Sequence, residues 1–447
     1  MALPQKQVLD QSARSGTSCC MIHLKTLLLS TLVPVFALGL AACRANTDAP
    51  TELAASFDVA AMDDLLSGAV ERGEVIGVQA LVFDEGQTVY RGSFGLADRE
   101  RNTPVTSDTV YRVYSMTKPV TSALIMDLME EGKLKLSDPA SKYIPQLAAM
   151  KIVSLGEDGK PAYEDQARPM TIEDLLLHRA GMAYGIFGGN PIEDAWGAAD
   201  LYNPQTPMAE NMDKMPNLPL LGQPGEQWFY SYSIDILGRI AEVITGQTLG
   251  EAMSERFFEP LGMTETSFTV APALKPRFAS NYMLQEDGSF VLAEDGQASP
   301  FTQPGKFQSG GGGLTSTTED WLKFARLLLN EGEVDGTRIL EPETVRLMMT
   351  DHLGDTPSLL PWIGGETGAG FGYGGSIQMT STPELETTKG RYPGQYGWGG
   401  AARTNFWVDP ENDAIGIIML QFFSPSDPQV HDDFQAMVLA QTRNAKK

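Results

Sequence analysis

The stretch of sequence that decides the fold is Ser115-Met116-Thr117-Lys118. An apolar run with helical spacing follows it and ends at Gly132, so the stretch is predicted to open a helix. Residues three positions apart on a helix lie on one face, which places the hydroxyl of Ser115 beside the amine of Lys118. A serine hydroxyl becomes a good nucleophile when a base takes its proton, and a buried lysine with a lowered pKa can be that base. The spacing therefore predicts a serine nucleophile, although a capped helix with a solvated lysine would have the same residues.

Strand patterns stand at both ends of the chain, and helical patterns stand between them. Two β-rich runs, 77–83 and 88–94, are joined by a short turn and predict a hairpin. The middle of the chain, roughly 138–275, alternates short helical patterns with Pro/Gly loops. Three further strand patterns lie near the C-terminus, at 371–380, 400–408 and 414–420. The sequence thus predicts an α/β (α+β) fold. One antiparallel sheet from both chain ends would be flanked by helices, with an inserted helical region and a site in the crevice between the two parts.

The composition excludes several classes of function. The chain has 447 residues and a formal net charge of −24, which repels nucleic acid and anionic lipid headgroups, so neither is predicted as a partner by charge attraction. It holds three cysteines and four histidines, and their pattern offers neither a disulfide framework nor a metal site. The glycines at 311–313 are not followed by the lysine of a phosphate-binding loop. We therefore predict no metal and no cofactor.

The N-terminal segment has the pattern of a bacterial export signal. Lys25 precedes a mostly apolar run at 27–42, which is too short to span a bilayer comfortably and ends in Leu-Ala-Ala before Cys43. This ending is similar to a lipobox, in which the cysteine is acylated, whereas a plain signal peptide and a buried helix are the alternatives. The sequence thus predicts a signal peptide at 1–42, a tether at 43–56 and a globular domain at 57–447. With Cys43 acylated, the protein would be exported and anchored to a membrane, on the periplasmic side of a bacterial envelope.

Four other stretches extend the pattern around Ser115. They are Thr171–Gly181, Pro224–Ser231, Gly311–Thr317 with Asp320, and Tyr396–Gly400. Together with Val113–Lys118, and in this order, they resemble the motifs of the serine β-lactamase and penicillin-binding superfamily, in its class C-like, β-lactamase-related branch. The resemblance covers nearly all of the chain after the tether. It implies the β-lactamase/penicillin-binding-protein-like fold and a β-lactamase-related serine hydrolase domain at 57–447.

The resemblance implies roles for the residues that handle the proton. Ser115 would attack the acyl carbon, while Lys118 and Tyr230 share its proton. A tyrosine near a lysine cation is expected to ionise more easily. His178 is a tempting general base, but Lys118 and Tyr230 already fill that role. We therefore expect its imidazole to hold a loop by hydrogen bonds.

The last of the four stretches is expected to complete the site. The backbone N–H groups of Ser115 and Ala401 are candidates for the oxyanion hole, and Gly399 and Gly400 would allow a close approach of the chain. Trp398 would form an apolar wall for the acyl or alcohol group, with simple core packing as its alternative.

Two departures from the family pattern bear on the substrate. The second motif reads Tyr230-Ser231-Tyr232 where class C β-lactamases have Tyr-x-Asn, and the third reads Trp398-Gly399-Gly400 where they have Lys-Thr-Gly. The missing lysine is associated with the carboxylate of penicillins. The W-G-G variant resembles the family VIII carboxylesterases, as do Asp235 and Gly238. We therefore predict a serine hydrolase whose substrates are small carboxylic esters. A β-lactamase or D-Ala-D-Ala carboxypeptidase acting on amides, and a non-catalytic surface-binding lipoprotein, are the alternatives.

Overall fold

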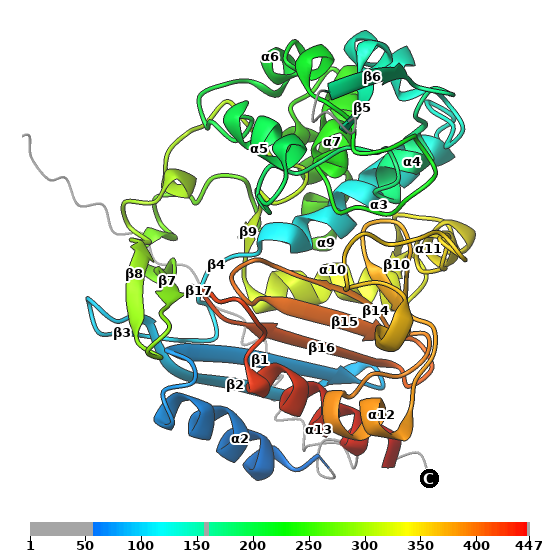
Figure 1. Cartoon of the computed structure of the whole chain (residues 1–447). Helices are drawn as coiled ribbons and strands as arrows, with labels where there is room; N and C mark the ends of the chain where they lie inside the picture. Colours follow the sequence, from blue (N-terminus) through cyan, green and yellow to red (C-terminus); the bar gives the residue numbers. More distant parts are fainter. Residues whose placement is uncertain (1–56, 156–160, 445–447) are drawn as a thin grey trace, which may run out of the picture. The chain divides into compact units, whose positions relative to one another are not determined.

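The centre of the fold is an antiparallel sheet of eight strands, in the order β12-β13-β14-β15-β16-β1-β2-β3 (Figure 1). Its strands are β1 (Gly77–Asp84), β2 (Gln87–Asp98), β3 (Thr103–Pro104), β12 (Ala369–Phe371), β13 (Ser376–Gln378), β14 (Tyr396–Gly399), β15 (Asn405–Asp409) and β16 (Ala414–Met419). Strand β1 pairs with β16 from Gln79 opposite Met419 to Asp84 opposite Ala414. The N-terminal hairpin therefore lies beside the C-terminal hairpin, and the predicted sheet from both ends of the chain is confirmed.

Helices cover both faces of this sheet. Helix α10 (Thr318–Leu329) packs on one face, whereas α2 (Val59–Glu71) and α13 (Gln429–Asn444) pack on the other. Side chains of a strand point alternately to opposite faces, and β1 shows the result. Leu81 and Phe83 belong to the core on the α10 face. Val78, Ala80 and Val82 belong to a second core under α2 and α13.

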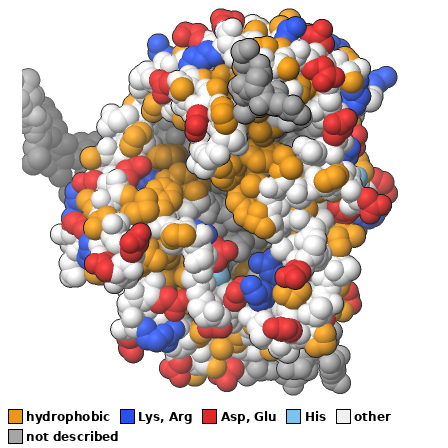
Figure 2. All heavy atoms as spheres, viewed as in Figure 1, with side chains coloured by type: hydrophobic (Ala, Val, Ile, Leu, Met, Phe, Trp, Pro, Cys, Tyr) orange, Lys and Arg blue, Asp and Glu red, His pale blue; other side chains and the backbone are white. Residues whose placement is uncertain are grey.

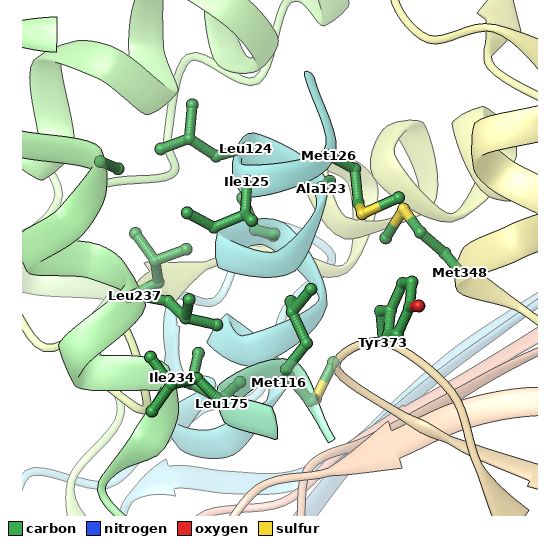
Figure 3. Packing of buried hydrophobic residues seen from close by; sticks show 14 of the residues in the cluster. Met116, Ala123, Leu124, Ile125, Met126, Leu175, Ile234, Leu237, Met348 and Tyr373 are labelled. Atoms are coloured by element: carbon green, nitrogen blue, oxygen red, sulfur yellow. The ribbon is translucent and has the colours of Figure 1, made fainter. Parts of the chain in front are cut away.

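The inserted helical region surrounds α3 (Thr117–Glu130), which follows the short 3₁₀ helix η1 (Tyr114–Met116). Every residue from Thr117 to Met126 is buried, as expected of a helix with neighbours on all sides. Figure 3 shows Leu124 and Ile125 of α3 pointing toward the neighbouring helix, which carries Ile234 and Leu237. The other helices of the described chain are α4 (Ile172–Leu176), α5 (Pro191–Ala198), α6 (Met208–Met212), α7 (Ser233–Thr245), α8 (Leu249–Met253), α9 (Glu259–Leu261), α11 (Pro342–Met348) and α12 (Pro383–Lys389). Because α3 is central, its first turn is buried as well.

Smaller strands tie the two parts of the domain together. Strand β4 (Tyr111–Arg112) leads into η1 and pairs with β9 (Thr315–Ser316), which follows the glycine-rich segment. The remaining pairings of the described residues join β5 (Lys151–Leu155) to β6 (Pro161–Asp165), β10 (Glu333–Val334) to β11 (Thr337–Arg338), and β7 (Asn281–Leu284) to both β8 (Phe290–Glu294) and β17 (Phe422–Phe423). The pairing of β4 with β9 brings the segment before Ser115 next to the segment after Gly313.

One predicted strand is wrong. The pattern at 371–380 predicts a single strand, but the chain reverses between Phe371 and Ser376 and forms β12 and β13 instead. Gly374 has a φ of 86°, a conformation that favours glycine. A Cβ at Gly374 would lie 2.9 Å from the carbonyl oxygen of Lys118, so this reversal packs closely against α3. The glycine therefore ends the strand and places this edge of the sheet beside the first turn of α3.

The computed structural model describes residues 57–155 and 161–444. The predicted signal peptide, the tether and the acylated Cys43 lie outside these residues and stay predictions. Within the described ranges, none of the helices is both long and apolar enough to cross a membrane.

Candidate active site

Ser115 stands at a strained turn between β4 and α3. Tyr114, the residue before it, has a φ of 43°, a left-handed conformation that costs a non-glycine residue about 1–3 kcal/mol. Its hydroxyl accepts a hydrogen bond from Nδ2 of Asn281 at 3.2 Å, and its ring packs against Phe301 and Phe423. These contacts hold the strained residue in place. Ser115 is left half-buried on the wall of a cleft, with its hydroxyl accessible.

Lys118 is fully buried one turn further along α3. Its Nζ lies 3.2 Å from the Ser115 Oγ, 3.2 Å from the hydroxyl of Tyr184 and 2.6 Å from the carbonyl oxygen of Gly311. Burial lowers the pKa of Lys118 to about 7, against an opposing effect of the Asp235 carboxylate. A large share of Lys118 is therefore neutral at pH 7. In that form two N–H groups can serve Tyr184 and Gly311, while the lone pair can accept the Ser115 proton.

Tyr230 lies in the segment before α7, and its hydroxyl hydrogen-bonds with that of Ser115. The indole Nε1 of Trp398 donates a second hydrogen bond to the same hydroxyl at 3.1 Å. The prediction that Lys118 makes Tyr230 easier to ionise is wrong, because burial raises the pKa of Tyr230 well above its usual value. The Lys118 Nζ lies 4.4 Å from the centroid of the Tyr230 ring. This amine therefore contacts the ring of Tyr230 and the hydroxyl of Ser115. Lys118, rather than Tyr230, has the pKa of a base at neutral pH.

His178 holds the Tyr230 segment, as predicted. Its Nδ1 accepts the backbone N–H of Ser231 at 3.1 Å, and its carbonyl oxygen accepts the backbone N–H of Phe229 at 3.0 Å. Its ring centroid lies 4.7 Å from that of Tyr230. Burial lowers the pKa of His178 well below its usual value, and Lys118 adds to the shift, so the imidazole stays neutral. His178 thus positions Tyr230 without titrating itself.

The third motif forms β14 and the turn that follows it. Ala401 is exposed and lines the same cleft as Ser115, and its N–H donates to no acceptor in the described part of the chain. A Cβ at Gly400 would collide with the carbonyl oxygen of Val113, so glycine is needed for the turn to lie against the segment before Ser115. Ser115 and Ala401, whose N–H groups are expected to form an oxyanion hole, thus line one cleft. Trp398 packs against Phe371 and also lines the cleft. Its role as a wall for the acyl or alcohol group stays a prediction.

Asp235 is a feature whose role the sequence does not reveal. It is fully buried in α7, and its Oδ1 accepts hydrogen bonds from the Ser309 hydroxyl and from the N–H of Gly311. The carbonyl oxygen of the same Gly311 accepts the Lys118 Nζ. A side chain at 311 would collide with the Asp235 carboxylate, which explains one of the three consecutive glycines. Asp235 therefore fixes the peptide that holds Lys118 and supplies it with a buried counter-charge.

Replacing Asp235 by asparagine is expected to shift the pH dependence of the site. Asparagine keeps an acceptor for Ser309 and Gly311 but removes the charge that raises the pKa of Lys118. The pKa of Lys118 should fall further, so the acidic limb of the kcat/KM profile should move to lower pH by about one unit. A profile measured with a neutral ester checks this. An unmoved acidic limb in a folded Asp235→Asn variant would contradict the charge coupling.

The cleft above these residues has a volume of about 1270 Å³. Figure 2 shows hydrophobic side chains gathered around this hollow. Much of its wall is aromatic, with Tyr184, Phe187, Tyr202, Tyr230, Phe307, Trp362 and Trp398 contributing. Among the described residues, no group of three or more His, Cys, Asp and Glu side chains could hold a metal ion. The arrangement therefore offers a nucleophile, a base and two N–H donors at the side of a large apolar cavity.

The fold and the site define a class, namely proteins of the β-lactamase fold that act as serine hydrolases or acyltransferases. The chain belongs to the Beta-lactamase family, whose family model matches residues 62–441. It is 35% identical to Protein Rv1367c from Mycobacterium tuberculosis, over 78% of this chain and 87% of that protein. It is 29% identical to Esterase EstB from Burkholderia gladioli, over 81% of this chain and 89% of that protein. A solved structure of a simvastatin synthase (LovD) mutant from Aspergillus terreus matches with a TM-score of 0.72 and 25% identity, over 86% of this chain and 95% of that chain. The resemblance seen in the motifs is thereby confirmed.

Proposed function

We propose that the protein is a carboxylesterase that works through an acyl-Ser115 intermediate. The observation that carries this proposal is the buried Lys118 amine, which lies 3.2 Å from the Ser115 Oγ and has a pKa lowered to about 7. A buried base with a pKa near the working pH is what general-base activation of a serine needs.

The reaction consists of two acyl transfers. Ser115 Oγ attacks the ester carbonyl as Lys118 takes its proton, and the N–H groups of Ser115 and Ala401 stabilise the oxyanion. Collapse of the tetrahedral intermediate breaks the bond to the alcohol, which leaves with the proton held by Lys118. Tyr230 stays protonated, and its hydroxyl keeps its hydrogen bond with the side chain of Ser115. Water then attacks the acyl-enzyme by the same steps in reverse and releases the acid.

The second and third motifs favour esters over β-lactams. Ser231 is buried and bound to His178, and Tyr232 is buried in the core, so this motif presents no amide side chain to the cleft. Where β-lactamases have a lysine, Trp398 stands instead and donates to the Tyr230 hydroxyl. An apolar indole suits the acyl or alcohol part of an ester better than the carboxylate of a penicillin.

The size of the cleft supports substrates larger than the small esters expected from sequence. A volume of about 1270 Å³ exceeds what a short acyl ester fills, and the aromatic walls suit bulky apolar groups. The same walls could hold an apolar alcohol beside the acyl-enzyme. Transfer of the acyl group to such an alcohol is therefore a second candidate function, in keeping with the name of the simvastatin synthase relative.

A labelling experiment with a substrate panel tests the proposal. We expect a fluorophosphonate probe to label Ser115, and p-nitrophenyl esters to be turned over much faster than nitrocefin or a D-Ala-D-Ala peptide. Nitrocefin turnover comparable to ester turnover would favour the β-lactamase alternative. A folded protein in which no probe labels Ser115 would favour the non-catalytic lipoprotein.

A further inference from the structure

A basic side chain without a partner stands on the wall of the cleft. Three basic residues line the cleft, namely Lys389, Arg391 and Arg403. Arg403 pairs with Asp427, and Lys389 pairs with Asp432 at 3.5 Å. Within residues 57–155 and 161–444, the half-buried guanidinium of Arg391 has neither an ion pair nor a side-chain hydrogen bond. A half-buried guanidinium without an ion-pair partner is suited to bind an anion that arrives from outside.

The backbone of Arg391 is held on both sides. Its N–H donates to the carbonyl oxygen of Leu385 at 3.2 Å, and its carbonyl oxygen accepts the Ser381 hydroxyl at 2.7 Å. Gly390 before it has a φ of 60° and ends α12, and a Cβ there would collide with the backbone of Gln435 on α13. The position of Arg391 is thus fixed by the end of α12 and by α13. Its side chain, by contrast, has no ion-pair or hydrogen-bond partner in the part of the chain that the structure describes.

The wall of the cleft continues from Arg391 to the oxyanion end of β14, with Gly397 and Gly399 among its lining residues. Along this strand Tyr396 belongs to the core on the α10 face and Trp398 packs against it, so Gly397 and Gly399 face the side of α12 and α13. A Cβ at Gly397 would collide with the carbonyl oxygen of Phe406 on β15, so glycine is needed for the two strands to lie this close. The amide side chain of Asn405, which lies opposite Gly399, also lines the cleft and has no hydrogen-bond partner among the described residues.

The length of β14 sets the distance between an anion at Arg391 and the scissile carbonyl. Strand β14 has four residues and rises about 3.3 Å at each of them. Arg391 precedes the strand, and Ala401 follows it. A carboxylate bound by Arg391 would therefore lie roughly 10 Å or more from the carbonyl carbon that Ser115 attacks. Figure 2 shows Lys and Arg side chains near the lower end of the apolar hollow.

We propose that Arg391 binds the carboxylate of the substrate, so that the protein prefers esters that carry a carboxylate at a distance from the scissile bond. This inference rests on the proposed esterase function and names its substrate class. The aromatic part of the cleft takes the apolar portion, and the part of the cleft beside Arg391 takes the acidic end. In a chain with a net charge of −24, an unpaired arginine at this place also draws an anionic substrate to one end of the cleft.

Mono-p-nitrophenyl esters of glutaric, suberic and sebacic acid test the proposal, beside p-nitrophenyl esters of monocarboxylic acids of equal chain length. The measured quantity is the ratio of kcat/KM for the acidic ester to kcat/KM for its neutral counterpart. We expect this ratio to be largest for the longer diacids and to fall with added salt. In Arg391→Gln it should fall roughly 10- to 100-fold, because a hydrogen bond to a charged group is lost. Arg391→Lys should retain part of the preference.

Arg72→Gln is the matched control, because Arg72 is an exposed arginine at the end of α2 with Glu74 as its partner. Its ratio should equal that of the unaltered protein. An unchanged ratio in Arg391→Gln would overturn the carboxylate site while leaving the esterase proposal intact.

A binding measurement separates this inference from the proposed function. Suberic acid monoanilide binds without turnover, and calorimetry on Ser115→Ala measures its affinity independently of catalysis. We expect the double variant Ser115→Ala, Arg391→Gln to bind it about 10-fold more weakly than Ser115→Ala alone. If no ester is hydrolysed, the esterase proposal fails. The two affinities would still show whether Arg391 binds the carboxylate. Equal affinity in the two variants would overturn the inference.

Discussion

Ser115→Ala is expected to lower kcat/KM for a p-nitrophenyl ester by about 10⁴- to 10⁶-fold. The hydroxyl of Ser115 lies 3.2 Å from the buried Lys118 amine and hydrogen-bonds with Tyr230. Without it the acyl-enzyme cannot form, and only the oxyanion donors and the cleft remain to assist water. The remaining activity should give no burst and no fluorophosphonate label.

The folded state should survive this change. Ser115 is half-buried and loses only a hydroxyl group, so its thermal unfolding midpoint should stay close to that of the unaltered protein. Ser67→Ala is a suitable control, because Ser67 lies in α2, on the opposite face of the sheet from α10. It should retain full activity. Ester hydrolysis by Ser115→Ala within a factor of ten of the unaltered rate would contradict the assignment of the nucleophile.

Periodicity and motif order predicted the sheet and α3 because each depends on residues that are near one another in sequence. Both hairpins and the helix after Ser115 have the apolar periodicity of a strand or a helix. Such a pattern identifies an element without knowledge of the rest of the fold. The prediction of one strand at 371–380 is wrong for a reason that is also local. Its apolar pattern was continuous, but the glycine at 374 adopts a conformation that strands do not use.

The parts of the site that sequence did not predict are contacts between distant segments. Lys118 meets the Gly311 carbonyl oxygen across 193 residues, and Trp398 meets the Tyr230 hydroxyl across 168 residues. Burial then decides the chemistry of each group. It lowers the pKa of Lys118 and raises that of Tyr230, whereas a tyrosine beside a lysine was expected to ionise more easily. The signs of these shifts depend on how deeply each side chain is packed, which composition does not report.

Lys118→Met should lower kcat/KM by about 10³- to 10⁴-fold, because it removes the base while roughly keeping the volume of the side chain. The methionine leaves the Gly311 carbonyl oxygen and the Tyr184 hydroxyl without the amine, so a loss of about 1–3 kcal/mol in unfolding free energy is expected as well. Activity must therefore be measured well below the unfolding midpoint. A parallel Lys142→Met variant, which loses an exposed amine that pairs with Asp138, serves as the control and should keep its activity.

The pH profile of the unaltered protein is the sharper test of Lys118. Its pKa is lowered to about 7, so the neutral amine predominates above that pH and the ammonium form below it. Only the neutral amine can accept the Ser115 proton, and kcat/KM should therefore rise with pH, level off above about pH 8 and fall about tenfold per unit below about pH 6. In Lys118→Met the residual activity should lose this limb, since the amine that titrates near pH 7 is gone. Burial keeps His178 neutral and Tyr230 protonated over this range. A limb that persists unchanged in Lys118→Met would show that a different group takes the proton.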